Sequence, residues 1–242
     1  MDDEAHQFQI PFRGAQREAS EDISRSNIPN PVSTGVLGLF KFGEQSHIEE
    51  FCKLGRLFMK PIREFRRLEA DELRGDRNEG VHWTLPSEQT KLQMEMDGVF
   101  RDIPGISGPI RYSRDLDQSV NVFCMYALRR RDPQSLVDPE NFIFGDTYVL
   151  LTDGDEFLKR VRKAVLPQDQ QLRWHLVEYV DPTTHMGPMG IFRKFTPFEY
   201  QSEFRIALVP GTGDDHCLDI GDLSDITTMG RLSDLNNRIK VE

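Results

Sequence analysis

The strongest constraint on the fold is the alternation of side chains in residues 198–209, near the C-terminal end of the chain. Successive side chains of a strand point to opposite faces, so residues two apart share a face. The even-numbered residues of this stretch are mostly apolar, whereas the odd-numbered ones begin with Glu199, Gln201, Glu203 and Arg205. We therefore predict a strand with one core face and one charged face.

The rest of the chain predicts an α+β domain with a mainly antiparallel or mixed central sheet and a few helices. Residues 119–128 are the most continuous apolar stretch of the middle third and are typical of a central strand buried on both faces. Residues 35–42 and 56–60 are strand candidates on either side of a helical pattern that ends at Gly55. Strands outnumber helices and do not alternate regularly with them, which favours a single α+β domain over residues 35–242.

Two helices are predicted from their capping residues and apolar faces. Ser46 is a suitable N-cap for the first helix, and Glu49 completes a capping box three residues later. Asp153 or Asp155 is a suitable N-cap for the second helix. The apolar face of the second helix consists of Phe157, Leu158, Val161 and Val165.

Two polar segments lie outside these predicted elements. Residues 1–34 are polar and interrupted by prolines, which predicts a flexible N-terminal arm, or an arm that docks onto a protein partner. Residues 61–80 are dense in charge. They are interpreted either as a charged surface loop or as a loop over a binding cleft, because loops on rigid scaffolds often carry function.

Composition excludes several classes of function. The 242 residues carry a formal net charge of −10, which argues against strong non-specific nucleic-acid binding. The three cysteines are far apart, and neither they nor the histidines have metal-ligand spacing, so no metal is expected. The sequence contains no apolar run long enough to cross a membrane and no signal peptide, so a cytoplasmic protein is expected. A Gly-x-x-x-x-Gly-Lys phosphate loop and a Gly-x-Ser-x-Gly elbow are also absent.

The charged face contains a Gln-x-Glu pair, Gln201 and Glu203, that resembles the strand motif of mono-ADP-ribosyltransferases. The surrounding residues 200–205, Tyr-Gln-Ser-Glu-Phe-Arg, are also similar to a group of bacterial proteins that end in an aromatic-x-x-Glu-aromatic-Arg strand. The opening order of strand, helix, Gly55 and strand is common to these transferases as well. Two departures are that Lys41 replaces the usual Arg or His, and that residues 122–126 lack the frequent Ser-Thr-Ser.

The resemblance implies an NAD-using transferase or NAD glycohydrolase that acts as a toxin or defence effector, with NAD as its substrate. Glu203 would be the catalytic carboxylate and Gln201 would orient the acceptor, while Lys41 and Tyr200 would contact NAD. The carboxylate would stabilise the positive charge that develops as the nicotinamide bond breaks. Independently of the resemblance, a cation two residues away on the same face, Arg205, is expected to hold Glu203 ionised.

Two other interpretations remain open at this point. The charged face is equally compatible with a solvated strand surface, because exposed antiparallel faces are usually polar. The acidic balance and residues 1–34 are also compatible with a non-catalytic interaction subunit of a phage-defence or toxin–antitoxin assembly that docks onto a basic partner.

Overall fold

The computed structural model describes residues 35–67, 77–86, 91–105, 107–114, 119–129, 137–166 and 169–238, and the predicted arm, residues 1–34, lies outside them. The larger strands are β1 (Val36–Gly43), β2 (Arg56–Pro61), β7 (Asn121–Arg129), β8 (Thr147–Leu151), β9 (Gln171–Leu176), β13 (Glu203–Val209), β14 (His216–Asp219) and β15 (Thr227–Arg231). The helices are α2 (Gln45–Leu54), α3 (Ile62–Arg67), α5 (Gly154–Val165) and α6 (Leu235–Arg238), with 3₁₀ segments η4 (Pro139–Phe144), η5 (Thr196–Gln201) and η6 (Leu232–Asp234).

These eight strands form one antiparallel sheet, so the predicted α+β class is confirmed. Along its main path the order is β14, β2, β7, β1, β8 and β15. β13 pairs with β7, and β9 pairs with β13. β7 is buried along most of its length, as its continuous apolar sequence predicts.

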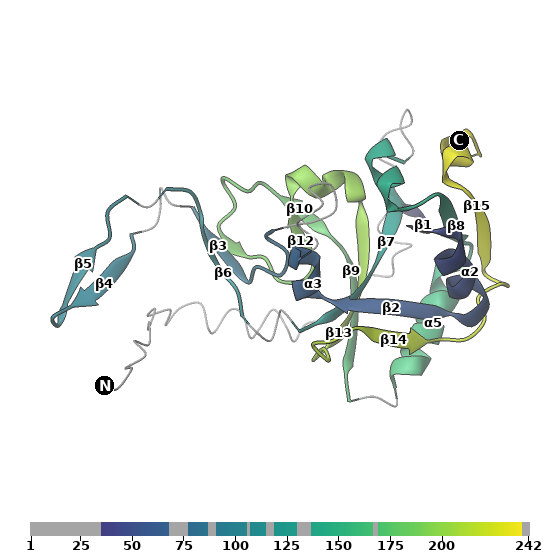
Figure 1. The fold of residues 1–242 in the computed structure, drawn as a ribbon, viewed down its shortest axis with the longest axis horizontal. Helices are drawn as coiled ribbons and strands as arrows, with labels where there is room; N and C mark the ends of the chain where they lie inside the picture. The colour runs from purple at the N-terminus through teal and green to yellow at the C-terminus, as the bar shows by residue number, and fades with distance from the viewer. Residues whose placement is uncertain are drawn as a thin grey trace.

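The sheet divides at β7, which has three neighbours (Figure 1). β13 follows one edge of β7 from Asn121 to Tyr126. The other edge is shared, because β1 pairs with it at residues 126–129 and β2 pairs with it at residues 121–122. Residues 123–125 therefore lie at a fork between β1 and β2.

Helices α2 and α5 cover one face of the sheet and create the main core. The predicted apolar face of α5 is buried, and the Asp153 carboxylate accepts a hydrogen bond from the Glu156 N–H at 2.9 Å, which confirms Asp153 as the N-cap. Gly55 ends α2 in the left-handed conformation, as predicted. The predicted capping box is wrong, because α2 begins at Gln45 and Ser46 lies inside it.

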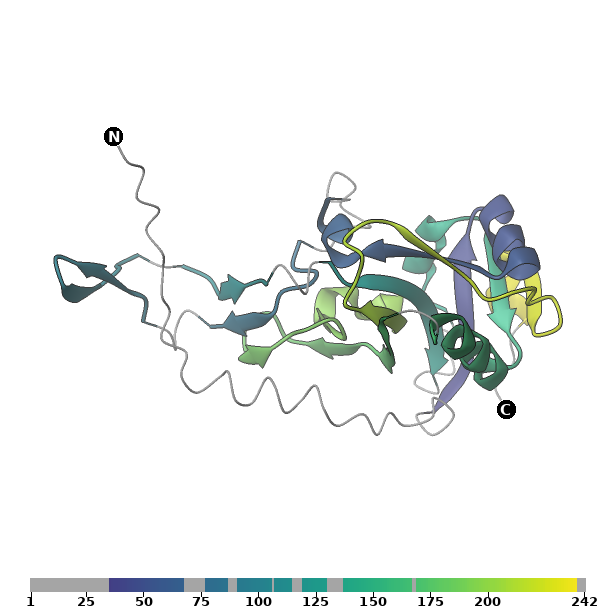
Figure 2. The same cartoon turned by 90° about the horizontal axis from the view of Figure 1, so that it is seen from below.

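A second layer covers the opposite face of β13. It contains a parallel pair, β10 (Glu178–Val180) with β12 (Arg193–Phe195), and a small sheet of β3 (Trp83–Leu85), β6 (Ile110–Tyr112) and β11 (Gly187–Pro188). Beyond this layer, a hairpin of β4 (Gln93–Met96) and β5 (Val99–Asp102) projects away from the body (Figures 1 and 2).

The long strand predicted for residues 198–209 is partly wrong. Residues 196–201 form η5, and the strand starts at Glu203. Pro197 lies in the first turn of η5, where its missing N–H is tolerated, and Ser202 ends the segment in the left-handed region at a φ of 39°. The alternation therefore holds only from Glu203 onward.

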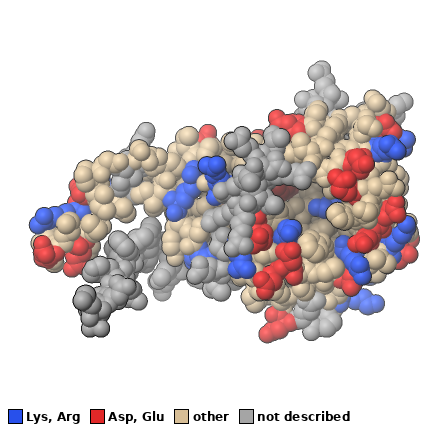
Figure 3. All heavy atoms as spheres, in the orientation of Figure 1, with Lys and Arg blue, Asp and Glu red and all other residues tan. Residues whose placement is uncertain are grey.

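The visible surface carries both signs of charge, and Lys and Arg are interspersed with Asp and Glu in Figure 3. Within the described residues, no helix is long and apolar enough to cross a membrane. In the same part of the chain, no group of three or more His, Cys, Asp and Glu is placed to hold a metal ion.

Gly55 provides a test of the packing of the turn between α2 and β2 against the backbone of Gly221. A Cβ at Gly55 would lie 1.9 Å from the Gly221 carbonyl oxygen, and its φ of 62° already disfavours other residues. We expect Gly55→Ala to lower the free energy of unfolding by more than about 2 kcal/mol in urea titrations. Gly105→Ala is the control, since Gly105 has a similar φ and a Cβ there would meet no atom within 4 Å, and it should cost only about 1 kcal/mol. Equal losses would contradict the role of the close backbone contact.

Candidate functional site

Glu203 and Arg205 lie on β13, two residues apart on the face opposite α2 and α5. Glu203 is opposite Tyr126 of β7, and Arg205 is opposite Cys124 of β7 and His175 of β9. Arg205 is 2% exposed and the Glu203 side chain 11% exposed. The interpretation as a solvated strand face is therefore wrong for these two residues, because the second layer covers them.

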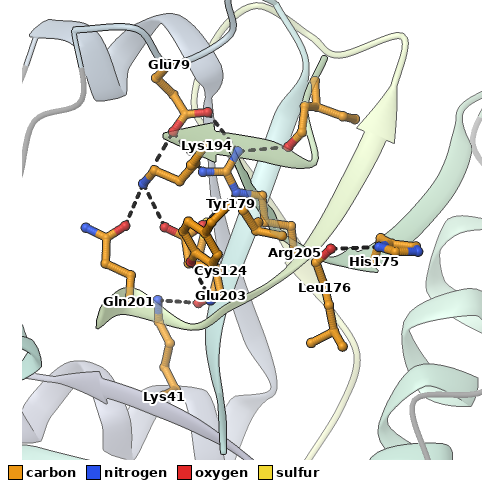
Figure 4. A network of polar contacts seen from close by, with 12 residues as sticks. Lys41, Glu79, Cys124, His175, Leu176, Tyr179, Lys194, Gln201, Glu203 and Arg205 are labelled. Atoms are coloured by element: carbon orange, nitrogen blue, oxygen red, sulfur yellow. Dashed lines mark hydrogen bonds and ion pairs between the residues drawn. The ribbon is translucent and has the colours of Figure 1, made fainter. Parts of the chain in front are cut away.

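Four side chains of alternating charge form a closed ring between β13 and the second layer (Figure 4). The Arg205 Nε donates to Glu203 Oε2 at 2.6 Å, and its two terminal nitrogens donate to the two Glu79 oxygens at 2.7 and 2.8 Å. Lys194 closes the ring, with its Nζ 2.9 Å from Glu203 Oε1 and 3.5 Å from Glu79 Oε2. We call these four residues, Glu79, Lys194, Glu203 and Arg205, the charge ring.

The charge ring holds Glu79, Glu203 and Arg205 ionised. Burial of the Glu203 carboxylate opposes its ionisation, but Arg205 and Lys194 outweigh this effect and hold its pKa well below the ordinary 4.5. The same balance of burial against Arg205 and Lys194 lowers the pKa of Glu79. Burial also disfavours the charged form of Arg205, yet the two carboxylates raise its pKa well above the ordinary value for arginine. Arg205 therefore helps to keep Glu203 ionised through one hydrogen bond from its Nε. Its bidentate contact, made by the two terminal nitrogens, is with Glu79.

Gln201 joins the charge ring through Lys194. Its Oε1 accepts a hydrogen bond from Lys194 Nζ at 2.5 Å, and its Nε2 donates to the Tyr200 hydroxyl at 3.2 Å. Gln201 is buried in η5, so it meets Glu203 through the shared lysine and not through the alternation of one strand. Glu199, in the same 3₁₀ segment, is exposed.

Two tyrosines border the site. The Tyr179 hydroxyl accepts a hydrogen bond from the Glu203 backbone N–H at 2.9 Å. Burial, together with the nearby Glu203 charge, raises the pKa of Tyr179. The Tyr200 carbonyl accepts a hydrogen bond from Asn141 Nδ2 at 2.7 Å, which fixes η5 against η4. The Tyr200 hydroxyl lies beside Gln201, whose Nε2 donates to it.

Lys41 occupies the fork of the sheet. Its Nζ donates to the Cys124 carbonyl at 2.9 Å and lies 4.8 Å from the centre of the Phe123 ring. Phe123 belongs to the core under α2 and α5, so the Lys41 side chain reaches the fork from the face opposite the charge ring. Burial lowers the pKa of Lys41, although the charge of Glu203 partly offsets this. The structure thus brings Glu203, Gln201 and Arg205 together and places Lys41 across the sheet from them.

The sequence did not identify Glu79 and Lys194 as site residues. Glu79 is 2% exposed, but it belongs to the charged segment 61–80, and the sequence does not distinguish it from the other charged residues of that segment. Lys194 follows Arg193 in residues 191–195, whose other three residues are apolar or aromatic. A lysine in such a segment is a weak indication of a buried, paired charge.

Comparison of the sequence with models of known protein families and with curated proteins found no match. Comparison of the structure with solved structures also found none. The assignment of the site therefore depends on its own geometry.

Breaking the charge ring is expected to cost far more than breaking a surface ion pair. Glu79→Gln leaves the Arg205 guanidinium buried with one carboxylate in place of two, so we expect the free energy of unfolding to fall by about 3–5 kcal/mol. Glu79→Gln combined with Arg205→Met leaves the neutral Glu203–Lys194 pair and should cost less than the sum of the single variants.

The control for this prediction is Asp225→Asn, which removes an exposed ion pair with Arg160 and should cost under about 1 kcal/mol. Urea unfolding of the four variants measures all these differences. Strict additivity of Glu79→Gln and Arg205→Met would show that the two side chains are not coupled.

The lowered pKa of Glu203 also predicts how stability depends on pH. A carboxylate with a folded-state pKa below 4.5 stabilises the fold fully at pH values above 4.5, and loses this contribution as the pH falls toward the folded-state value. The difference in unfolding free energy between the parent and Glu203→Gln should therefore narrow as the pH falls below 4.5. Urea unfolding at neutral and at acidic pH measures this difference, and a difference that stays constant would contradict the assigned ionisation.

Proposed function

We propose that this chain is an NAD-using enzyme that cleaves the bond between nicotinamide and ribose, as an ADP-ribosyltransferase or an NAD glycohydrolase. Glu203 is its catalytic carboxylate, and a role as a bacterial toxin or defence effector is part of this proposal. The observation that carries it is the charge ring, which fixes an ionised glutamate at the start of a central strand beside Gln201.

A fixed negative charge suits this type of reaction. Cleavage of a glycosidic bond passes through a transition state in which the sugar carries positive charge, and a carboxylate held beside it lowers the barrier. Arg205 and Lys194 orient both oxygens of Glu203 before any substrate binds. A carboxylate oxygen accepts more than one hydrogen bond, so a ribose hydroxyl can still bind there.

The charge ring suits a leaving group that needs no proton. Both carboxylates have lowered pKa values and remain ionised at neutral pH, so neither acts as a general acid. The ammonium group of Lys194 already faces acceptors on Gln201, Glu203 and Glu79. In NAD the nicotinamide ring is a positively charged pyridinium attached to the ribose. When that bond breaks, the ring keeps the bonding electrons and leaves as neutral nicotinamide without being protonated. Ordinary O-glycosides, whose leaving oxygen is protonated by an acid, fit this site less well.

Glu203 is also the member of the charge ring that a substrate can best reach. Its side chain is 11% exposed, compared with 6% for Lys194, 2% for Arg205 and 1% for Glu79. Glu203 is thus proposed to touch the substrate, whereas the other three members position it. Gln201 is proposed to orient the acceptor, since its amide group is fixed by Lys194 and Tyr200.

The decisive variant is Glu203→Gln, which keeps the shape of the side chain and removes its charge. We expect it to lower the rate of NAD consumption by at least about a hundredfold. Glu199→Gln, at an exposed position of η5, is the matched control and should keep the parent rate. Nicotinamide release from NAD, followed by chromatography, measures both rates. Equal rates for the parent and Glu203→Gln would overturn the role of Glu203.

A second candidate function is that of a non-catalytic protein-interaction subunit. The observation that favours it is the projecting β4–β5 hairpin, which exposes large apolar side chains. NAD binding separates the two candidates, because a ligand at a hundred times its dissociation constant stabilises the fold by about 2.7 kcal/mol. Absence of both a thermal shift and NAD consumption in the parent protein would favour the interaction subunit.

A further inference from the structure

The β4–β5 hairpin is preorganised, and no other described element packs over its strands. Asp97 and Gly98, at φ values of 53° and 75°, form its two-residue turn, and this conformation matches the twist of paired strands. All eight strand residues are exposed. Figures 1 and 2 both show the hairpin extending beyond the rest of the molecule. It therefore makes little use of the protein's own core.

The two faces of the hairpin differ in character. Cross-strand pairing places Met94 opposite Arg101 and Met96 opposite Val99. The backbone hydrogen bond from Ile103 to Leu92 extends the same ladder by one pair. We call the resulting surface the methionine face: Leu92, Met94, Met96, Val99, Arg101 and Ile103. The reverse surface is the acidic face: Gln93, Glu95, Phe100 and Asp102.

The methionine face has the composition of a surface that is covered in use. An isolated two-stranded hairpin is only marginally stable in water, and burial of one face stabilises it. Four of the ten large apolar side chains that are exposed in the described part of the chain belong to this hairpin: Met94, Met96 and Val99 on the methionine face and Phe100 on the reverse face. Such a concentration at one projecting site marks an interaction surface, and methionines adapt well to the shape of a partner.

We propose that the β4–β5 hairpin docks into an apolar groove of a basic protein. One wall of the groove covers the methionine face, and Lys and Arg side chains of the opposite wall and the rim pair with Glu95 and Asp102 of the acidic face and with Asp97 of the turn. Charge complementarity decides the kind of partner. Within residues 93–102 the acidic Glu95, Asp97 and Asp102 outnumber Arg101, and the whole chain has a net charge of −10, so the hairpin attracts a basic protein in preference to nucleic acid, an anionic membrane or a second copy of this chain. This surface is separate from the charge ring, and neither proposal depends on the other.

Arg101 provides an internal check on the sign of the partner's charge. It is the one charged side chain of the methionine face, and its charge is unfavourable toward a basic groove. Its aliphatic stem can cover Met94 while the guanidinium extends to the edge of the hairpin. Arg101→Gln is therefore expected to strengthen docking, whereas loss of an acidic residue is expected to weaken it.

The test uses the whole protein and three fluorescently labelled synthetic peptides of about twelve residues, which is the combined length of two ordinary strands. The first alternates Leu and Lys, the second alternates Ser and Lys, and the third alternates Leu and Glu. Fluorescence anisotropy at physiological salt measures their binding. We expect the Leu–Lys peptide to bind at least about tenfold more tightly than either of the others, because it alone offers the hairpin both the apolar contact and the positive charge of the proposed partner.

Variants of the hairpin locate the binding. Met96→Ser with Val99→Ser, and separately Glu95→Gln with Asp102→Asn, should each weaken binding of the Leu–Lys peptide at least about tenfold. Leu166→Ser is the matched control, because Leu166 is a highly exposed leucine after α5, and it should bind as the parent does. The substituted hairpin residues are exposed, so the thermal midpoint of the body should not change.

Four outcomes would overturn the proposal. The first is parent-like binding by the hairpin variants. The second is equal binding of the Ser–Lys peptide, which would show attraction by charge alone. The third is a parent dimer, detected by sedimentation, that the Met96→Ser and Val99→Ser pair converts to monomer, since the occupant would then be a second copy of this chain. Binding of the hairpin to vesicles of anionic lipid would likewise replace a protein partner by a membrane.

Discussion

Four charges can be buried together here only because their signs alternate. Each carboxylate of the charge ring contacts both cations, so no charge is left without a partner of opposite sign. Arg205 has the central position, since its guanidinium also donates to the Ile191 carbonyl at 2.8 Å. The ring thereby attaches β12 and the segment that carries Glu79 to the central sheet. The second layer depends on this attachment as much as on its small apolar cluster around Val81, Met189 and Phe195.

The fork in the sheet explains why the site lies where it does. Tyr126 of β7 pairs with Phe40 of β1 on one edge and with Glu203 of β13 on the other. Glu203 therefore lies beside the last pair of β1 and β7 before the sheet divides. At the division the Cys124 carbonyl accepts a hydrogen bond from Lys41. The same geometry places ionisable side chains on both faces of the sheet within a short distance of the fork.

Local patterns predicted the elements well, and long-range pairing accounts for what they missed. The apolar face of α5, the end of α2 at Gly55 and the buried strand β7 follow from periodicity and caps, which are properties of neighbouring residues. The predicted start of β13 was wrong because residues 196–201 form a 3₁₀ segment with about three residues per turn, so the alternation of polar and apolar residues there does not sort side chains onto two faces. Gln201, Glu203 and Arg205 were grouped correctly, but no local pattern indicates that Glu79 pairs with Arg205. That partnership depends on which segment packs over β13.

The sequence distance between the partners of the charge ring has a consequence for folding kinetics. Glu79 and Arg205 are 126 positions apart, so their pairing closes a very long loop of chain. Contacts of this kind form after local structure has assembled, and interactions absent from the transition state mainly slow unfolding. The charge ring is therefore expected to form late in folding. It should slow the unfolding rate more than it speeds the folding rate.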